Sequence, residues 1–319
     1  MQETKIKSLV ITNLKTGKTT QASKFPKSLI LGFEMGYLAL PDVMALPITR
    51  WSDFKQVLKQ LKTDEAHEMY DNIVVDVVDI AYDLCEKYIC SKNGVDTIGD
   101  IGYGGGYAQT KKEFDECIRQ IPQMGYGLVL ISHAQDKTFT DEDGKEYNQI
   151  TPTLGNQGRL VVDRMADIIG YARPVETEEG TKTYLFMRGT PRFIAGSRFK
   201  YTPEVIEFTY DNLVKAIDDA ITKQAEETGN DSVTSEKDDA RTEKPNYDFN
   251  ALMGEFNEIV NKLQEIGGGS FGTKYAPTIA KIVEKYLGKG KKISNATEQQ
   301  AEQVALIVSD LEEFVGNGI

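Results

Sequence analysis

The sequence predicts an α/β fold with a mostly parallel sheet and helices on both faces. Two aliphatic runs, 72–79 and 127–132, have the nearly continuous apolar character of strands that are buried in a parallel sheet. Stretches with helical spacing of apolar residues occur between such runs, as at 51–61 and 110–124. This alternation places crossover helices on both faces of one sheet, and ligands of such sheets bind beyond the carboxyl ends of the strands.

The rest of the first 223 residues continues this alternation. A helix is expected from residue 80 to about residue 90. We expect further strands at 8–11, 28–33, 167–172, 183–187 and 207–209. Glycine, proline and polar residues predict irregular segments at 37–49 and 91–107. Residues 134–158 are polar, and a β-turn at 141–144 is expected there within either a hairpin or a mobile loop.

Composition divides the chain into three parts. Residues 224–247 hold few apolar and many charged side chains, which is typical of a flexible linker. Residues 1–223 before it are predicted to form the α/β domain. Residues 248–319 after it are predicted to form a small helical domain, with helices at 249–266, 275–287 and 297–315.

The chain has 319 residues, of which 40% are hydrophobic, so it can bury a sizeable core. A net charge of −12 argues against a generic basic DNA-coating protein, although a local basic groove remains compatible with it. No run of 18 apolar residues and no apolar leader are present, so we expect a cytoplasmic protein without membrane contact. Cys85, Cys90 and Cys117 form no C-x-x-C pair and are expected to be buried, reduced thiols.

A Gly-Lys-Thr turn follows the first predicted strand directly. A strand that ends in such a turn before a helix is the P-loop arrangement, in which backbone N–H groups bind phosphate. Lys18 is expected to reach the β- and γ-phosphates of ATP, and the Thr19 hydroxyl to bind Mg²⁺. The candidate phosphate-binding residues are Thr16, Gly17, Lys18, Thr19 and Thr20.

The P-loop pattern G-x-x-x-x-G-K-[ST] is incomplete in this chain. Thr12 stands at the position of the first glycine, and Asn13 and Leu14 replace the usual small residues or proline. Because that glycine lets the loop turn without a Cβ clash, its loss is expected to weaken nucleotide binding or slow hydrolysis. An ordinary loop lysine at position 18 is the alternative interpretation.

Three polar residues follow predicted strands. Asp76 ends the Ile-Val-Val run, where a carboxylate holds Mg²⁺, with Asp79 as the alternative; either one can instead cap the next helix. Glu34 ends the second strand, where it can deprotonate the attacking water or be a surface glutamate. His133, directly after Ser132, can contact the γ-phosphate or be a satisfied histidine at a strand end.

The order of these motifs resembles that of RecA-like P-loop ATPases. It resembles in particular the phage-encoded nucleotide-binding proteins with an AAA domain, which act in recombination and single-strand annealing. The resemblance covers about residues 5–222 and is carried by Gly17-Lys18-Thr19, Glu34, Asp76 and His133. It implies Mg²⁺-dependent ATP hydrolysis, a head-to-tail homo-oligomer and single-stranded DNA as a partner. A single-strand-binding or annealing protein is a further implied partner.

The segment 195–200 is similar to the one that carries basic residues to the nucleotide of a neighbouring subunit in this family. The resemblance therefore implies that Arg198 and Lys200 act in trans, and solvated surface charge is the alternative.

Three segments are candidates for contact with DNA. In the loop after Asp76, Tyr103 and Tyr107 among glycines suit base stacking. The loop after His133 is acidic and suits DNA poorly. In the tail, the basic cluster at 288–293 is either a phosphate contact or a helix-ending turn, and its lysines are Lys289, Lys291 and Lys292.

Three functions remain open from the sequence. The first is an ATPase that binds single-stranded DNA. The second is a nucleotide-gated assembly module with little hydrolysis, because of Thr12. The third is another P-loop enzyme, such as a kinase or a packaging motor. The sequence shows no arginine-rich lid and no nuclease or long translocation module, which argues against this third class.

Overall fold

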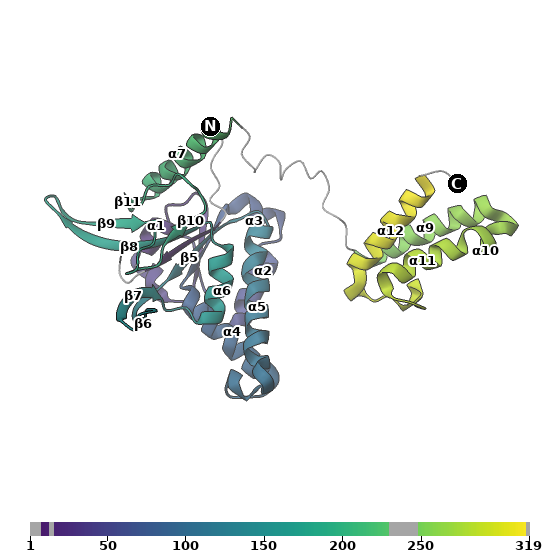
Figure 1. Ribbon diagram of the computed structural model, residues 1–319, viewed down its shortest axis with the longest axis horizontal. Helices are drawn as coiled ribbons and strands as arrows, with labels where there is room; N and C mark the ends of the chain where they lie inside the picture. Colours follow the sequence, from purple (N-terminus) through teal and green to yellow (C-terminus); the bar gives the residue numbers. More distant parts are fainter. Residues whose placement is uncertain (1–7, 13–15, 230–247, 317–319) are drawn as a thin grey trace. The chain divides into compact units, whose positions relative to one another are not determined.

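The computed structural model describes residues 8–12, 16–229 and 248–316 of this chain. The chain forms two compact units, residues 1–233 and 234–319. The first unit is the α/β part and the second is helical (Figure 1).

Within the described residues, the first unit is built on a nine-stranded sheet in the order β11-β9-β8-β1-β5-β4-β2-β3, with β10 beside β8. The pairs from β3 across to β8 are parallel, and those of β8 with β9 and β10, and of β9 with β11, are antiparallel. The strands are β1 Ser8–Thr12, β2 Ser28–Gly32, β3 Ala45–Pro47, β4 Asn72–Asp76, β5 Gly127–Ser132, β8 Ile168–Thr177, β9 Gly180–Phe186, β10 Gly196–Ser197 and β11 Val205–Glu207.

Helices cover both faces of this sheet, because neighbouring strand residues point to opposite sides. Leu31 and Val75 lie in a core with α2, α4, α5 and α6, whereas Ile30 and Val74 lie in a core with α1 and α7. The predicted α/β fold class, a mostly parallel sheet with helices on both faces, is therefore confirmed. The helices are α1 Lys18–Ala22, α2 Trp51–Gln60, α3 Asp64–Met69, α4 Val78–Asn93, α5 Gly105–Gln123, α6 Asn156–Met165 and α7 Tyr210–Thr228.

Two hairpins extend this architecture. β6 (Ala134–Thr140) and β7 (Glu146–Pro152) form a separate two-stranded sheet directly after β5. β8 and β9 continue past the level of Thr12 as a ribbon that extends away from the sheet (Figure 1). Of the two alternatives expected for residues 134–158, a hairpin or a mobile loop, the hairpin is therefore the one that forms.

Three predicted boundaries are wrong. Residues 37–49 include β3, which is three residues long and is held by pairing with β2, so it has no periodic signal of its own. Residues 91–107 belong partly to the ends of α4 and α5. A Cβ on Gly106 would lie 2.1 Å from the Ile98 carbonyl oxygen, so this glycine permits close packing rather than a loop.

The third boundary is the start of the linker. Residues 224–228 are the last turns of α7, not part of an irregular segment. The rest of the predicted linker, from residue 230 to 247, lies outside the described residues.

The second unit has a core of its own, formed by side chains such as Phe256, Leu263 and Leu311. The helices expected at 249–266 and 275–287 are confirmed, and the last helix begins at residue 301 after a short 3₁₀ turn. They are α9 Phe249–Gly267, α10 Phe271–Lys274, α11 Ala276–Leu287 and α12 Ala301–Gly316. In the part of the chain that the structure describes, no helix is long and apolar enough to cross a membrane.

The three cysteines are buried and free, as predicted. Burial raises the pKa of the Cys117 thiol to about 12, so this sulfur is held in its neutral form.

Candidate nucleotide-binding site

The candidate site lies where four parallel strands end at the carboxyl edge of the sheet. The register sets Thr12 of β1 beside Ser132 of β5, and Gly32 of β2 beside Asp76 of β4. Because these residues share one level, the segments that follow them leave the sheet next to each other. The sequence reached the same conclusion from strand ends alone, and the register supplies the reason.

Gly17 of the Gly-Lys-Thr turn has a backbone conformation that suits the turn into α1. Gly17 adopts φ 69° and ψ 21°, a left-handed conformation that glycine accepts without strain, and it caps α1. The Gly17 carbonyl accepts a bond of 2.9 Å from the Gln21 N–H, which starts the helix. The Lys18 side chain is buried, with 6% exposed. Asn13 and Leu14 lie outside the described residues.

Thr12 is a strand residue rather than a loop residue. It is buried, pairs with both Ser132 and Tyr171, and its Oγ1 donates to the Gly170 carbonyl at 3.3 Å. The position that a glycine holds in the full pattern is therefore the last position of β1, and no turn is required of it.

Thr19 and Asp76 are in direct contact. Thr19 Oγ1 donates to Asp76 Oδ2 at 2.8 Å, and Asp76 is only 3% exposed. The carbonyl of Asp76 accepts the N–H groups of Phe33 and Glu34 at 2.7 and 3.0 Å, which ties the end of β2 to the end of β4. A hydroxyl and a carboxylate side by side are the protein ligands of Mg²⁺ in P-loop proteins.

Burial shifts the pKa values of both charged groups in this contact. Desolvation raises the pKa of Asp76, against the Thr19 hydrogen bond and the Lys18 ammonium, which lower it. Desolvation also lowers the pKa of Lys18, against the opposing effect of the nearby carboxylates, Asp76 first. A proton therefore competes with Mg²⁺ for Asp76 at a higher pH than it does at an exposed aspartate.

Glu34 and His133 form a second pair at the same edge. Glu34 Oε2 lies 3.0 Å from His133 Nε2, and the Glu34 side chain is 48% exposed, so water reaches its carboxylate. His133 Nδ1 is buried and has no hydrogen-bond partner among the described residues. His133 is therefore not a fully satisfied strand-end histidine.

Asp79 has a role that the sequence did not reveal. From the first turn of α4 its carboxylate accepts the Ser132 hydroxyl at 2.8 Å and the His133 N–H at 2.9 Å. It therefore fixes the end of β5 and the direction in which His133 leaves the strand. The signal available in the sequence was a second carboxylate three residues after Asp76, which indicates a polar contact but does not identify the partner.

The residues present fit a nucleotide with Mg²⁺. The described residues include no group of three or more His, Cys, Asp or Glu side chains that could hold a metal by themselves. An ion at Thr19 and Asp76 must therefore take other ligands from phosphate and water, as Mg²⁺ commonly does. Thr16 Oγ1 is buried without a partner in the described part of the chain, and it can donate to a phosphate oxygen. Thr20 is exposed beside it.

Arg198 and Lys200 are not brought to this site within one chain. Arg198 Nη1 lies 3.0 Å from Asp167 Oδ1, and the Asp167 N–H donates to the carbonyl of Ser8, the first residue of β1. Arg198 is therefore at the amino edge of the sheet, opposite the P-loop. Lys200 Nζ lies 2.9 Å from Glu227 Oε2 in the last turn of α7.

Arg188 holds the segment that carries these two residues. Its guanidinium donates to the carbonyls of Ser197, Phe199 and Lys200 at 2.9 to 3.1 Å, and to the Thr202 hydroxyl at 3.1 Å. Sequence reasoning missed it, although a cation two residues after the end of β9 is the same kind of signal that identified Asp76.

The DNA-contact candidates are exposed side chains on both units of the chain. Tyr103 is fully exposed with φ 56°, and Tyr107 is 48% exposed in the first turn of α5. Lys289, Lys291 and Lys292 are exposed in the second unit.

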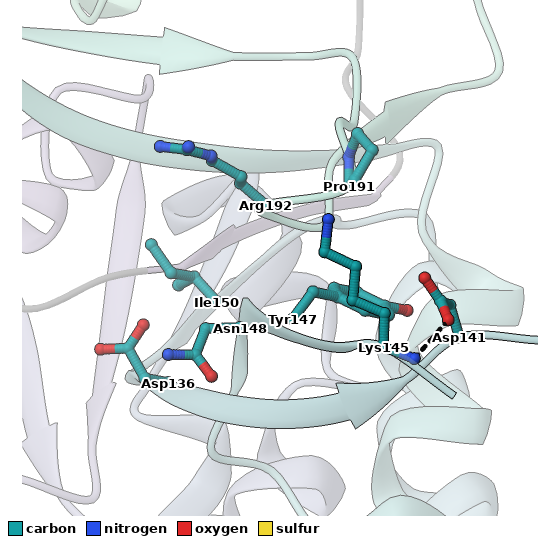
Figure 2. Close-up of a pocket in the computed structure, with 8 residues that line it drawn as sticks. All are labelled: Asp136, Asp141, Lys145, Tyr147, Asn148, Ile150, Pro191 and Arg192. Carbon is teal, nitrogen blue, oxygen red and sulfur yellow. Dashed lines mark hydrogen bonds between the residues drawn. The ribbon is translucent and has the colours of Figure 1, made fainter. Parts of the chain in front are cut away.

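The segment expected to be acidic is more mixed in charge than its sequence indicates. The β6–β7 hairpin and the 190–194 turn line an open pocket of about 770 Å³. Asp136 and Asp141 line it together with Lys145 and Arg192 (Figure 2). The Ile150 N–H donates to the Arg192 carbonyl at 2.7 Å and joins the two segments. Arg192 lies far from the hairpin in the sequence. The sequence of the hairpin alone therefore does not show that this positive charge lies beside its aspartates.

The chain is similar to known proteins in its sequence. Residues 4–199 match a family model described as an AAA domain. The SPbeta prophage-derived protein YorG of Bacillus subtilis (strain 168) is 32% identical over 311 residues, covering 94% of this chain and 90% of that relative. A solved KaiC-like protein from Pyrococcus horikoshii OT3 is 12% identical and covers 59% of this chain and 80% of its own, with a TM-score of 0.34. The chain belongs to the AAA domain family of P-loop nucleotide-binding proteins.

Proposed function

We propose that this chain is a Mg²⁺-dependent ATPase that assembles head to tail and acts on single-stranded DNA in the cytoplasm, in recombination or annealing. The observation that carries the hydrolytic part is the pairing of Thr19 with Asp76 at 2.8 Å beside the pair of Glu34 with His133 at 3.0 Å. One pair suits a phosphate-bound Mg²⁺ and the other suits an attacking water, and both lie at the edge from which the P-loop leaves.

In the proposed reaction, each side chain has one task. The backbone of residues 16–20 and the Lys18 ammonium hold the β- and γ-phosphates, and Thr19 and Asp76 hold Mg²⁺, which neutralises charge on those phosphates. Glu34 accepts a proton from the water that attacks the γ-phosphorus, while the bond to the β-phosphate oxygen breaks and ADP leaves. His133, released from Glu34, contacts the γ-phosphate.

Hydrolysis is tested by measuring ATP turnover of the full chain with Mg²⁺, with and without oligo(dT). We expect Mg²⁺-dependent turnover that oligo(dT) increases. Binding of ATP without turnover under both conditions would replace the ATPase by a nucleotide-gated assembly module. Failure to bind ATP would contradict the assignment of the P-loop itself.

The assembly module is the second candidate, because Thr12 ends β1 where the full pattern has glycine. The observation against it is Glu34, a carboxylate that contacts His133 among the described residues and has about half of its side-chain surface open to water. A module that only binds ATP does not require such a base.

For DNA, the proposal is supported by Tyr103 and Tyr107, two exposed aromatic side chains at the start of α5 and in the turn before it. An annealing or single-strand-binding protein is the partner that fits this activity. A head-to-tail oligomer is supported by the position of Arg198 at the amino edge of the sheet, opposite its own P-loop, because from there it can contact a nucleotide only in a neighbouring chain.

The action in trans predicts complementation between two inactive variants. A Lys18→Met chain lacks its own phosphate contact but keeps Arg198, and an Arg198→Ala chain has the reverse defect. We expect each variant alone to turn over ATP slowly, and an equimolar mixture to recover a fraction of wild-type turnover. A mixture that is no faster than the sum of its parts would show that Arg198 serves only its ion pair with Asp167.

A further inference from the structure

The second unit has an uneven distribution of charge between its helices. Residues 268–297 contain six lysines and one glutamate, a net charge of +5 in a chain whose total is −12. By contrast α9 carries three glutamates and one lysine, and α12 carries four acidic residues and no basic one. The basic residues of this unit are therefore concentrated on α10, α11 and the turn that follows.

Two of the six lysines are engaged within the unit. Lys285 Nζ lies 2.8 Å from Asp310 Oδ2 on α12, and the Lys274 ammonium lies 4.9 Å from the ring centre of Tyr275. The other four are exposed, and no ion pair joins them to the rest of the described chain. These four, called the lysine face below, are Lys281, Lys289, Lys291 and Lys292.

The turn that presents this face is ordered. Gly288 and Gly290 have φ of 102° and 76°, which glycine adopts without strain. The Gly290 N–H donates to Glu284 Oε1 at 2.9 Å, so the single carboxylate of this stretch holds the backbone of the turn. The Lys292 N–H donates to Asn295 Oδ1 at 2.9 Å, which fixes the far end. The lysine side chains therefore extend from a fixed backbone.

Favourable interaction with the helix dipole does not account for this face. A cation in the last turn of a helix stabilises its carboxyl end, and Lys285 already occupies that position in α11. Lys291 and Lys292 follow the end of the helix and lie beyond the reach of that effect.

The two tyrosines nearby are engaged within the unit. Tyr275 is 2% exposed, and the Tyr286 hydroxyl is bound to Asp310 at 2.9 Å. A surface on which exposed lysines predominate recognises the phosphates of a nucleic acid rather than its bases.

We propose that the lysine face binds the sugar–phosphate backbone of single-stranded DNA without regard to sequence. The proposal rests on the proposed action on single-stranded DNA and adds a second contact on a unit separate from the ATPase site. Two contacts on one chain raise the total affinity for a strand that reaches both.

The test compares the full-length wild type with a variant in which all four residues of the lysine face are glutamine. Fluorescence anisotropy measures the affinity for labelled oligo(dT) across a series of NaCl concentrations with ATP and Mg²⁺. We expect the variant to bind at least about tenfold more weakly at low salt, with the slope of log K against log[salt] reduced by about 3. A variant with four arginines should restore both quantities, because it keeps the charge.

The control replaces four exposed lysines of the first unit by glutamine, namely Lys59, Lys62, Lys215 and Lys223. It makes the same change in net charge and should leave affinity and salt slope close to those of the wild type.

Equal affinity and slope for wild type and lysine-face variant would overturn the inference and leave the proposed function intact. A wild type that binds no oligo(dT) at low salt would contradict the DNA part of the proposed function. A change in DNA-free ATP turnover in the lysine-face variant would assign the face to a protein contact instead.

Discussion

Replacement of Glu34 by glutamine is expected to lower kcat for ATP hydrolysis about 10²–10⁴-fold, the usual contribution of a general base. The amide keeps the size of the side chain and can keep a contact with His133 Nε2, now 3.0 Å from the carboxylate, but it cannot accept the proton of water. KM should change little, because Glu34 is assigned no contact with bound ATP before the transition state. Steady-state phosphate release at saturating ATP and Mg²⁺ measures the effect.

The matched control for this substitution is Glu68→Gln, which removes the same charge at an exposed position of α3. It should leave kcat at the wild-type value. Equal turnover of Glu34→Gln and wild type would show that Glu34 is not the base, and the ion pair with His133 would then be its whole role.

Replacement of Lys18 by methionine is expected to lower kcat/KM for ATP about 10²–10³-fold or more, because a preorganised cation is removed from the β- and γ-phosphates. The free energy of unfolding of the nucleotide-free protein should not fall. The buried ammonium is held at a cost, since desolvation is the largest effect on its pKa and lowers it. Methionine fills a similar volume without that desolvation cost. The substitution is therefore expected to lower kcat/KM without lowering the free energy of unfolding.

The same substitution has a pH dependence with a definite sign. The pKa of Lys18 is lower in the folded chain than its ordinary value of 10.5, so the unfolded chain binds this proton more tightly. Between the lowered pKa and about 10.5, the stability of the wild type therefore rises with pH relative to that of Lys18→Met. Urea unfolding of both proteins from neutral to alkaline pH measures the difference. If the stability of the wild type relative to Lys18→Met instead fell with rising pH, the attraction of Asp76 would raise the pKa of Lys18 more than burial lowers it.

Lys24→Met serves as the control for both measurements, because Lys24 is exposed two residues after the end of α1. It should alter neither ATP turnover nor the pH dependence of unfolding. A loss of turnover in this control as large as that of Lys18→Met would indicate general damage to the P-loop helix.

The candidate site was readable from the sequence because its signals are local. Asp76 and His133 each follow a buried aliphatic run, and parallel strands bring their carboxyl ends to one edge whatever the order of the strands. Gly17 was readable for the same reason, since a left-handed turn before a helix favours glycine. The helical unit was predicted from apolar spacing, which needs no knowledge of distant contacts.

Tertiary structure alone decided the roles that depend on pairing between distant residues. Thr12 departs from the P-loop pattern in sequence, and only the register with Ser132 and Tyr171 shows that it is the last residue of a strand. The place of Arg198 at the amino edge follows from its contact with Asp167. The N–H of Asp167 donates a hydrogen bond to the carbonyl of Ser8, a residue far away in the sequence. Spacing along the chain encodes what lies on one face of an element, whereas the partner of that face is fixed by packing and hydrogen bonding between elements.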